Sequence, residues 1–126
     1  MADIVLRCGV IEESLASGSI LLKLKPHFVK KRTESMPNGN PTVWHVNEYL
    51  IPHDALIDLL PWLEADINER WYAHAFNIEE DLLYVVLHDK SFKLPTIRDS
   101  TWDKMIEYGK TVGCDPRWTE NVPLSV

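Results

Sequence analysis

The sequence predicts one α+β domain spanning residues 1–126, in which a mostly antiparallel sheet carries two main helices packed on one of its faces. Three observations predict this class. Short β-branched or alternating segments recur along the chain, apolar residues recur at helical spacing in two places, and turn residues separate neighbouring strands closely enough for hairpins. A content of 45% hydrophobic and 25% charged residues is ordinary for a folded domain.

The first third of the chain predicts strands with one short helical turn between them. Residues 4–8 are apolar and largely β-branched, and residues 19–25 alternate between an apolar face and a face that carries lysines, so both segments predict strands. Residues 12–16 fit one helical turn. Because proline cannot donate a hydrogen bond to a sheet ladder, Pro26 is expected to interrupt the strand over residues 19–25. Residues 27–32 then predict a second strand.

A polar segment separates this region from the next strand. Residues 33–41 predict an exposed and mobile loop, in which Asn38-Gly39 is the expected turn. Residues 42–51 then alternate between polar and apolar side chains and predict a strand.

The middle of the chain predicts a helix that opens at Pro52. Proline suits the first turn of a helix, where its missing N–H would have no partner. The buried stripe of this helix is predicted at Leu56, Leu59, Leu60, Leu63 and Ile67. Pro61 falls inside the pattern, where a proline removes a hydrogen bond at a cost of about 3 kcal/mol. We therefore expect a break near Leu60 and a second short helix that begins at Pro61.

The next segment predicts strands joined by tight turns. Residues 70–76 alternate, with alanines on one side, which predicts that a helix packs on that side. Residues 79–81 predict a polar turn, and residues 82–87 are apolar on both faces, which predicts a strand at the centre of the sheet. Residues 89–90 then turn the chain into a hairpin with residues 91–94.

The last helix has the clearest end signals. Ser100 and Asp103 have the spacing of a capping box, and Gly113 is placed to end the helix. The apolar face between these ends consists of Trp102, Met105, Ile106, Gly109 and Val112. A glycine within that face predicts the close approach of another backbone. Residues 114–126 predict an irregular tail that packs through Trp118.

The negative charge of the chain is concentrated in one segment. The net charge is −6, and residues 41–81 carry nine acidic side chains against one arginine, whereas residues 1–40 carry a net charge of +2. Such a negative field repels nucleic acid and anionic membranes and attracts basic partners, so nucleic acid is not an expected partner.

The chain shows no signal of export or of a membrane location. No apolar run approaches the roughly 20 residues of a membrane span. We expect no signal peptide, and the two distant cysteines fit free thiols in a reducing compartment. These features predict a cytoplasmic protein.

The chain lacks the sequence motifs of common catalytic and cofactor sites. It has no Gly-x-Ser-x-Gly motif, no glycine-rich phosphate loop, no dinucleotide fingerprint and no His-Glu-x-x-His motif. We therefore expect no cofactor and no metal, and the pattern favours a binding protein over an enzyme. One alternative stays open, because His45, His74 and His88 fall on predicted strands and would form an acid–base or ligand site if the strands brought them together. In the other interpretation, these histidines face solvent and bind nothing.

Acidic residues and tryptophans gather in residues 54–71 and form the candidate partner-binding surface. Its members are Asp54, Asp58, Trp62, Glu64, Asp66, Glu69 and Trp71. Tryptophans provide large anchors at protein interfaces, and carboxylates steer a basic partner and set its orientation. The alternative is that both tryptophans lie in the core and the carboxylates only keep the surface soluble.

Taken together, these patterns predict a small cytosolic protein that binds a basic protein domain and blocks it stoichiometrically. In charge and size, though in no motif, the chain is similar to the immunity proteins that neutralise basic toxin or nuclease domains. Two alternatives are a small enzyme or ligand-binding domain that uses the strand histidines, and a subunit of a larger assembly or homo-oligomer whose exposed apolar patch is a fixed interface.

Overall fold

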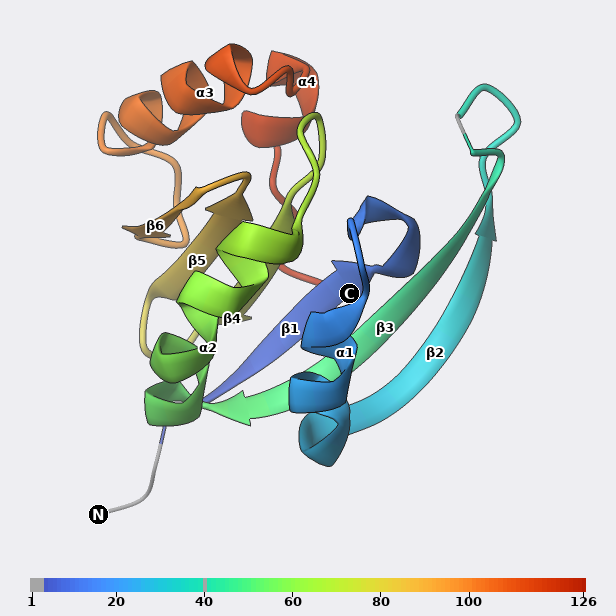
Figure 1. The fold of residues 1–126 in the computed structure, drawn as a ribbon. Helices are drawn as coiled ribbons and strands as arrows, with labels where there is room; N and C mark the ends of the chain where they lie inside the picture. Colours follow the sequence, from blue (N-terminus) through green and yellow to red (C-terminus); the bar gives the residue numbers. More distant parts are fainter. Residues whose placement is uncertain (1–3, 40) are drawn as a thin grey trace.

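The strands of the protein form one antiparallel sheet. The computed structural model describes residues 4–39 and 41–126, and its sheet has six strands in the order β2-β3-β1-β4-β5-β6 (Figure 1). The strands are β1 (Val5–Ile11), β2 (Phe28–Ser35), β3 (Val43–Pro52), β4 (Ala73–Asn77), β5 (Leu82–Leu87) and β6 (Lys90–Leu94). Every neighbouring pair is antiparallel. The predicted α+β class and antiparallel sheet are therefore confirmed.

The two main helices pack on opposite faces of this sheet, which corrects the prediction that they share one face. Helix α2 (His53–Asp66) and the shorter α1 (Ser19–Leu24) pack against strand residues such as Leu6 and Tyr84, on what we call the α2 face. Helix α3 (Trp102–Thr111) packs against Leu83 and Val85, on the α3 face. The physical reason lies in β5, whose side chains are buried on both sides, because an apolar strand of this kind needs cover on both faces.

Strand β5 is not at the centre of the sheet as predicted. It pairs with β4 on one side and with the edge strand β6 on the other. Its burial comes from helices on both faces rather than from a central position in the strand order.

Residues 19–24 form a helix, so the predicted strand over residues 19–25 is wrong. Ile20 and Leu24, one helical turn apart, are both buried, whereas Leu22 between them is 76% exposed. The backbone N–H groups of Ser17 and Ile20 at the start of this helix donate to the carboxylate of Asp66, at 2.8 and 3.3 Å. Asp66, which lies 46 residues after Ile20 in the sequence, thus provides an acceptor for backbone N–H groups at the start of α1.

The chain between α1 and β2 accommodates Pro26 in a short 3-10 helix, η2 (Lys25–His27). A second such turn, η1 (Glu12–Ser14), follows β1 and agrees with the predicted turn at residues 12–16. Proline is tolerated at the first positions of a helix because its missing N–H has no partner there, so Pro26 separates the helix from the strand.

Helix α2 continues through Pro61, so the predicted break near Leu60 is wrong. Pro61 removes the N–H that would bond the carbonyl of Ile57, four residues earlier. Both residues lie on the exposed side of the helix, where water can take over that hydrogen bond. The cost of the proline is therefore smaller than in a buried helix.

The β2–β3 hairpin is longer than predicted and projects beyond the rest of the sheet (Figure 1). Pairing of β2 with β3 reaches Ser35 and Val43, which leaves a shorter loop than the predicted segment 33–41. Gly39 N–H donates to the Met36 carbonyl at 2.7 Å, which closes a turn containing Asn38. Residue 40 of the predicted loop lies outside the described residues.

The chain after β6 covers the α3 face. The predicted capping box does not form, because the Asp103 N–H donates to the backbone carbonyl of Ser100, at 3.1 Å, and no side chain caps the start of α3. Gly113 ends α3 with a φ of +83°, as predicted. The predicted irregular tail contains one short helix, α4 (Pro116–Thr119), which packs on Gly109 of α3 through the buried Thr119. No helix among residues 4–39 and 41–126 is long and apolar enough to cross a membrane.

Candidate functional site

The structure places part of the predicted partner-binding surface on the outer side of α2. Asp54, Ile57, Asp58, Pro61 and Trp62 all lie on this exposed side, and we call them the α2 surface. Trp62 is 57% exposed and Ile57 is 46% exposed. None of the ion pairs formed within the described residues involves a carboxylate of α2.

Lysines of the first third of the chain do not neutralise these carboxylates. Lys31 pairs with Glu12 at 2.7 Å. The Nζ of Lys23 lies 4.3 Å from the ring centre of Trp62, as a cation–π contact. This contact leaves the carboxylates of Asp54 and Asp58 free to act on a partner.

The other predicted members of the surface have different surroundings. Glu64 accepts a hydrogen bond from Ser91 Oγ at 2.6 Å, and Glu69 is exposed in the turn after α2. Asp66 is only 5% exposed and holds the start of α1. Burial acts to raise the pKa of Asp66, but hydrogen bonds from Ser17 and Ile20 outweigh burial and keep the pKa below its ordinary value. Asp66 therefore has a structural role.

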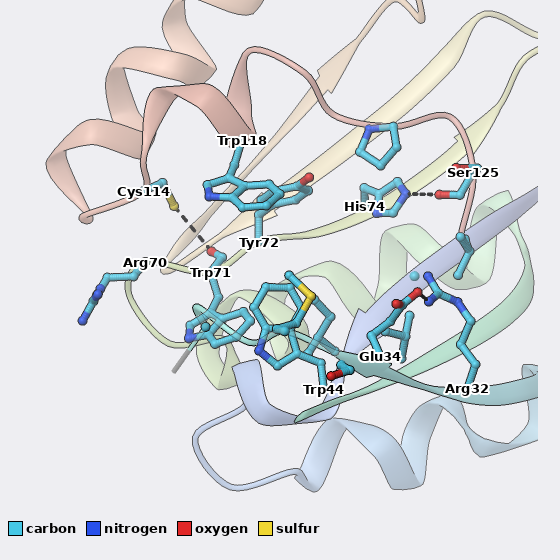
Figure 2. Close-up of a pocket in the computed structure, with 18 of the residues that line it drawn as sticks. Arg32, Glu34, Trp44, Arg70, Trp71, Tyr72, His74, Cys114, Trp118 and Ser125 are labelled. Atoms are coloured by element: carbon cyan, nitrogen blue, oxygen red, sulfur yellow. Dashed lines mark hydrogen bonds and ion pairs between the residues drawn. The ribbon is translucent and has the colours of Figure 1, made fainter. Parts of the chain in front are cut away.

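The three histidines predicted on strands do not converge, and His88 lies in the turn between β5 and β6. His45 Nδ1 lies 2.7 Å from a carboxylate oxygen of Glu13, and His88 Nδ1 lies 2.8 Å from the Ile67 carbonyl oxygen. His74 lies on the α3 face, paired across the sheet with Val85, and Figure 2 shows its ring beside Ser125. Within the described part of the chain, no group of three or more His, Cys, Asp or Glu side chains could hold a metal ion. The geometry gives no support to a site built from all three.

Both cysteines are buried free thiols. Burial raises the pKa of Cys8 to about 12 and the pKa of Cys114 to about 11. Because the thiolate is the reactive form, neither side chain is suited to nucleophilic chemistry near neutral pH.

A pocket of about 970 Å³ lies on the α3 face. Its floor comes from β1, β3 and β4, one wall is the β2–β3 hairpin, and the other is α4 with the segment that follows it (Figure 2). We call it the aromatic pocket, because its lining includes Trp44, Trp71, Tyr72 and Trp118. Trp44 and Trp71 meet edge to face, with ring centres 5.0 Å apart. Trp118 is 53% exposed, so the prediction that the tail packs through this residue is wrong.

Arginines outnumber acidic side chains in the lining of this pocket. Arg32, Arg70 and Arg117 contribute to it, against Glu34 alone. Arg32 pairs with Glu34, and Arg117 pairs with Asp115 at 2.7 Å. In the described residues Arg70 has no carboxylate partner.

His74 ties the C-terminal segment to the floor of the aromatic pocket. Its Nε2 lies 2.8 Å from the Ser125 carbonyl oxygen, and its ring stacks on Phe76 with centres 5.7 Å apart. Burial lowers the pKa of His74, and the positive charge of Arg7 acts in the same direction. The neutral ring donates Nε2–H to the carbonyl and holds this wall of the pocket in place.

Comparison of the chain with protein-family models, with curated proteins and with solved structures finds no match. The functional argument therefore rests on the geometry of the α2 surface and of the aromatic pocket.

Proposed function

We propose that the chain is a binding module for a basic protein domain and that the α2 surface is the contact. The observation that carries this proposal is the exposed indole of Trp62 beside two carboxylates, those of Asp54 and Asp58, that have no ion-pair partner in the described structure. Interface hot spots combine a large aromatic anchor with charged neighbours that select the partner.

The charge row along α2 favours a basic partner. Asp54 and Asp58 lie four residues apart, where like charges oppose each other by about 0.2–0.5 kcal/mol. Asp54 is compensated in part because it lies in the first turn of α2, near the positive end of the helix dipole. Asp58 lacks this compensation, so a lysine or arginine of a partner would gain from contact with it.

Apolar side chains extend the α2 surface onto α1. Leu22 of α1 is largely exposed, and Lys23 beside it reaches the ring of Trp62. Leu22, Ile57 and Trp62 thus expose apolar side chains on two helices that pack together, with acidic neighbours on α2, a composition expected of a protein interface. In this proposal the chain covers the active or substrate-binding surface of a basic domain, as a stoichiometric inhibitor of the immunity-protein kind.

The test begins with a partner purified from the native host and then measures its association with variants of the chain. Asp54→Lys combined with Asp58→Lys should slow association by about tenfold or more and flatten its dependence on salt, because both carboxylates steer the partner. Trp62→Ala should speed dissociation by about tenfold or more.

The matched control is Glu79→Lys combined with Glu80→Lys, which changes the net charge equally in the exposed turn after β4. This control should alter the association rate by no more than about threefold. Equal slowing by both double variants would show that only net charge matters and would refute the α2 surface as the contact. The activity of the partner should fall to zero at one equivalent of the chain, and an unchanged activity would refute the inhibitor role.

A further inference from the structure

The aromatic pocket lies apart from the α2 surface. Its volume of about 970 Å³ is at the upper end of the range for sites that take small molecules, about 300–1,000 Å³. It lies on the α3 face, whereas the α2 surface lies on the outer side of a helix that covers the opposite face. The two sites can therefore be tested separately.

The rings of the aromatic pocket favour a planar ligand. Three of the five tryptophans of the chain contribute to its lining, together with Tyr72. Figure 2 shows Trp118 and Tyr72 towards the α4 side of the pocket and Trp44 and Trp71 towards the β3 side. Burying an indole normally stabilises a fold, yet Trp118 is left half exposed here. Aromatic faces of this kind stack on planar rings of many kinds.

An exposed arginine without a carboxylate partner in the described residues, Arg70, belongs to the pocket lining, and Figure 2 shows its guanidinium at the edge of the pocket, directed away from the rings, where it could meet an anionic group that projects from a bound ligand. Arg70 lies next to Trp71, and its stem packs against Gly113, where an added Cβ would come within 2.9 Å of Arg70 Cγ. Its backbone has a φ of +79°, and its N–H donates to the Val112 carbonyl at 2.8 Å. A non-glycine residue held in this conformation is a feature that clusters at functional sites.

A second arginine, Arg117, also belongs to the pocket lining. Arg117 belongs to α4, a few residues after Gly113, and its pair with Asp115 is solvent-exposed. Arg117 donates to Asp115 Oδ2 from Nε at 3.1 Å and from Nη2 at 2.7 Å, so an incoming anion would meet the remaining N–H groups of this guanidinium. Guanidinium groups match the geometry of phosphate and carboxylate oxygens.

A long polyanion does not fit the rest of the molecule. The chain has a net charge of −6, and residues 41–81 alone carry nine acidic side chains against one arginine. This field opposes each additional phosphate of a nucleic acid strand, whereas a ligand with a single anionic group meets only the local arginines.

We propose that the aromatic pocket binds a small planar aromatic molecule that carries a phosphate or carboxylate, with its ring against the tryptophans and its anionic group at Arg70 and Arg117. The phosphate and carboxylate forms share this chemistry. Adenosine 5′-monophosphate is the probe for the first form and indole-3-acetate is the probe for the second, with adenosine and indole as their uncharged counterparts.

The experiment is a calorimetric titration of the full chain at low salt with each probe. At least one anionic probe should bind saturably with a Kd below about 1 mM, and at least about fivefold more tightly than its uncharged counterpart. Trp118→Ala should weaken that binding by at least about fivefold, since one stacking surface is lost. Arg70→Gln, which keeps the length of the stem, should weaken it by a similar factor.

The chain offers a matched control for each variant. Trp62→Ala removes an equally exposed tryptophan on α2, and Arg98→Gln removes an exposed arginine outside the pocket lining. Both controls should bind the probe within about twofold of the unmodified chain.

Several outcomes would overturn the proposal. They are the absence of saturable binding of both anionic probes up to about 5 mM, equal binding of the uncharged counterparts, and equal losses in the pocket variants and their controls. Tighter binding of a single-stranded oligonucleotide than of adenosine 5′-monophosphate would assign the pocket to nucleic acid instead. Failure here leaves the protein-binding role of α2 standing, because Trp62 and Trp118 report on the two sites separately.

Discussion

Replacement of Asp66 by alanine should destabilise the protein more than any other single carboxylate change in α2. The carboxylate accepts the N–H of Ser17 at 2.8 Å, the hydroxyl of Ser17 at 2.8 Å and the N–H of Ile20 at 3.3 Å. Ile20 is buried, so its N–H would lose its partner without gaining water. Ser17 is exposed, so water can replace the bond to its hydroxyl.

The magnitude follows from the two backbone donors. A hydrogen bond to a charged acceptor contributes about 1.5–3 kcal/mol, and a buried donor left without a partner costs about 1–3 kcal/mol. Allowing for relaxation of the short α1, we expect Asp66→Ala to lower the free energy of unfolding by about 2–4 kcal/mol. Asp66→Asn keeps one acceptor oxygen and should cost about 1–2 kcal/mol.

Urea unfolding followed by tryptophan fluorescence measures this change. Asp58→Ala is the matched control, because Asp58 is exposed on the same helix, and its replacement should change stability by less than about 0.5 kcal/mol. Because the pKa of Asp66 is lowered in the folded state, its stabilising effect is present above the ordinary pKa of 3.8 and is lost as the pH falls through the folded-state pKa. An Asp66→Ala protein as stable as the control would refute the role assigned to this carboxylate.

Three further predictions concern stability and reactivity. Burial lowers the pKa of His74 from its ordinary 6.5, so the unfolded chain binds a proton first as the pH falls, and the free energy of unfolding should decline below about pH 6.5. Urea unfolding of the His74→Gln variant should show a weaker decline, and an unchanged pH dependence would contradict this account. Pro61→Ala should raise the free energy of unfolding by about 1–3 kcal/mol, because α2 continues through this position, whereas no change in thermal unfolding would indicate a broken helix. Cys8 and Cys114 should resist a thiol reagent in the folded protein and react only once urea exposes them, and rapid labelling without urea would disprove their burial.

The strand pattern could be predicted from the sequence because each strand carries its own local signal. Residues 82–87 are apolar throughout and residues 42–51 alternate, and both segments are strands in the structure. The strand predicted over residues 19–25 is wrong, because the spacing of Ile20 and Leu24 fits a helix as well as a strand. Contact with the distant Asp66 favours the helix, and no local pattern reports on that contact.

The two candidate sites also differ in how far the sequence could predict them. Three members of the α2 surface could be predicted because Asp54, Asp58 and Trp62 lie at helical spacing within one element. The aromatic pocket could not be predicted, because its lining residues come from segments that are distant in the sequence. Only the strand order β2-β3-β1-β4 and the C-terminal segment bring these residues together. The one sequence signal of the pocket was the excess of tryptophans, which does not say which of them meet.

The placement of the sites on opposite faces has a consequence for how they act. We propose a basic macromolecule as the partner of the acidic α2 surface and a small anion as the ligand of the aromatic pocket, whose lining carries more arginine than acidic side chains. Substitutions at well-separated sites without shared contacts have additive effects. The double variant Trp62→Ala with Trp118→Ala should therefore lose protein binding and ligand binding by the same factors as the two single variants. A larger or smaller loss would show that the sheet couples the two faces. Trp71 would be the connecting residue, because its ring lines the pocket and also packs against the core beneath α2.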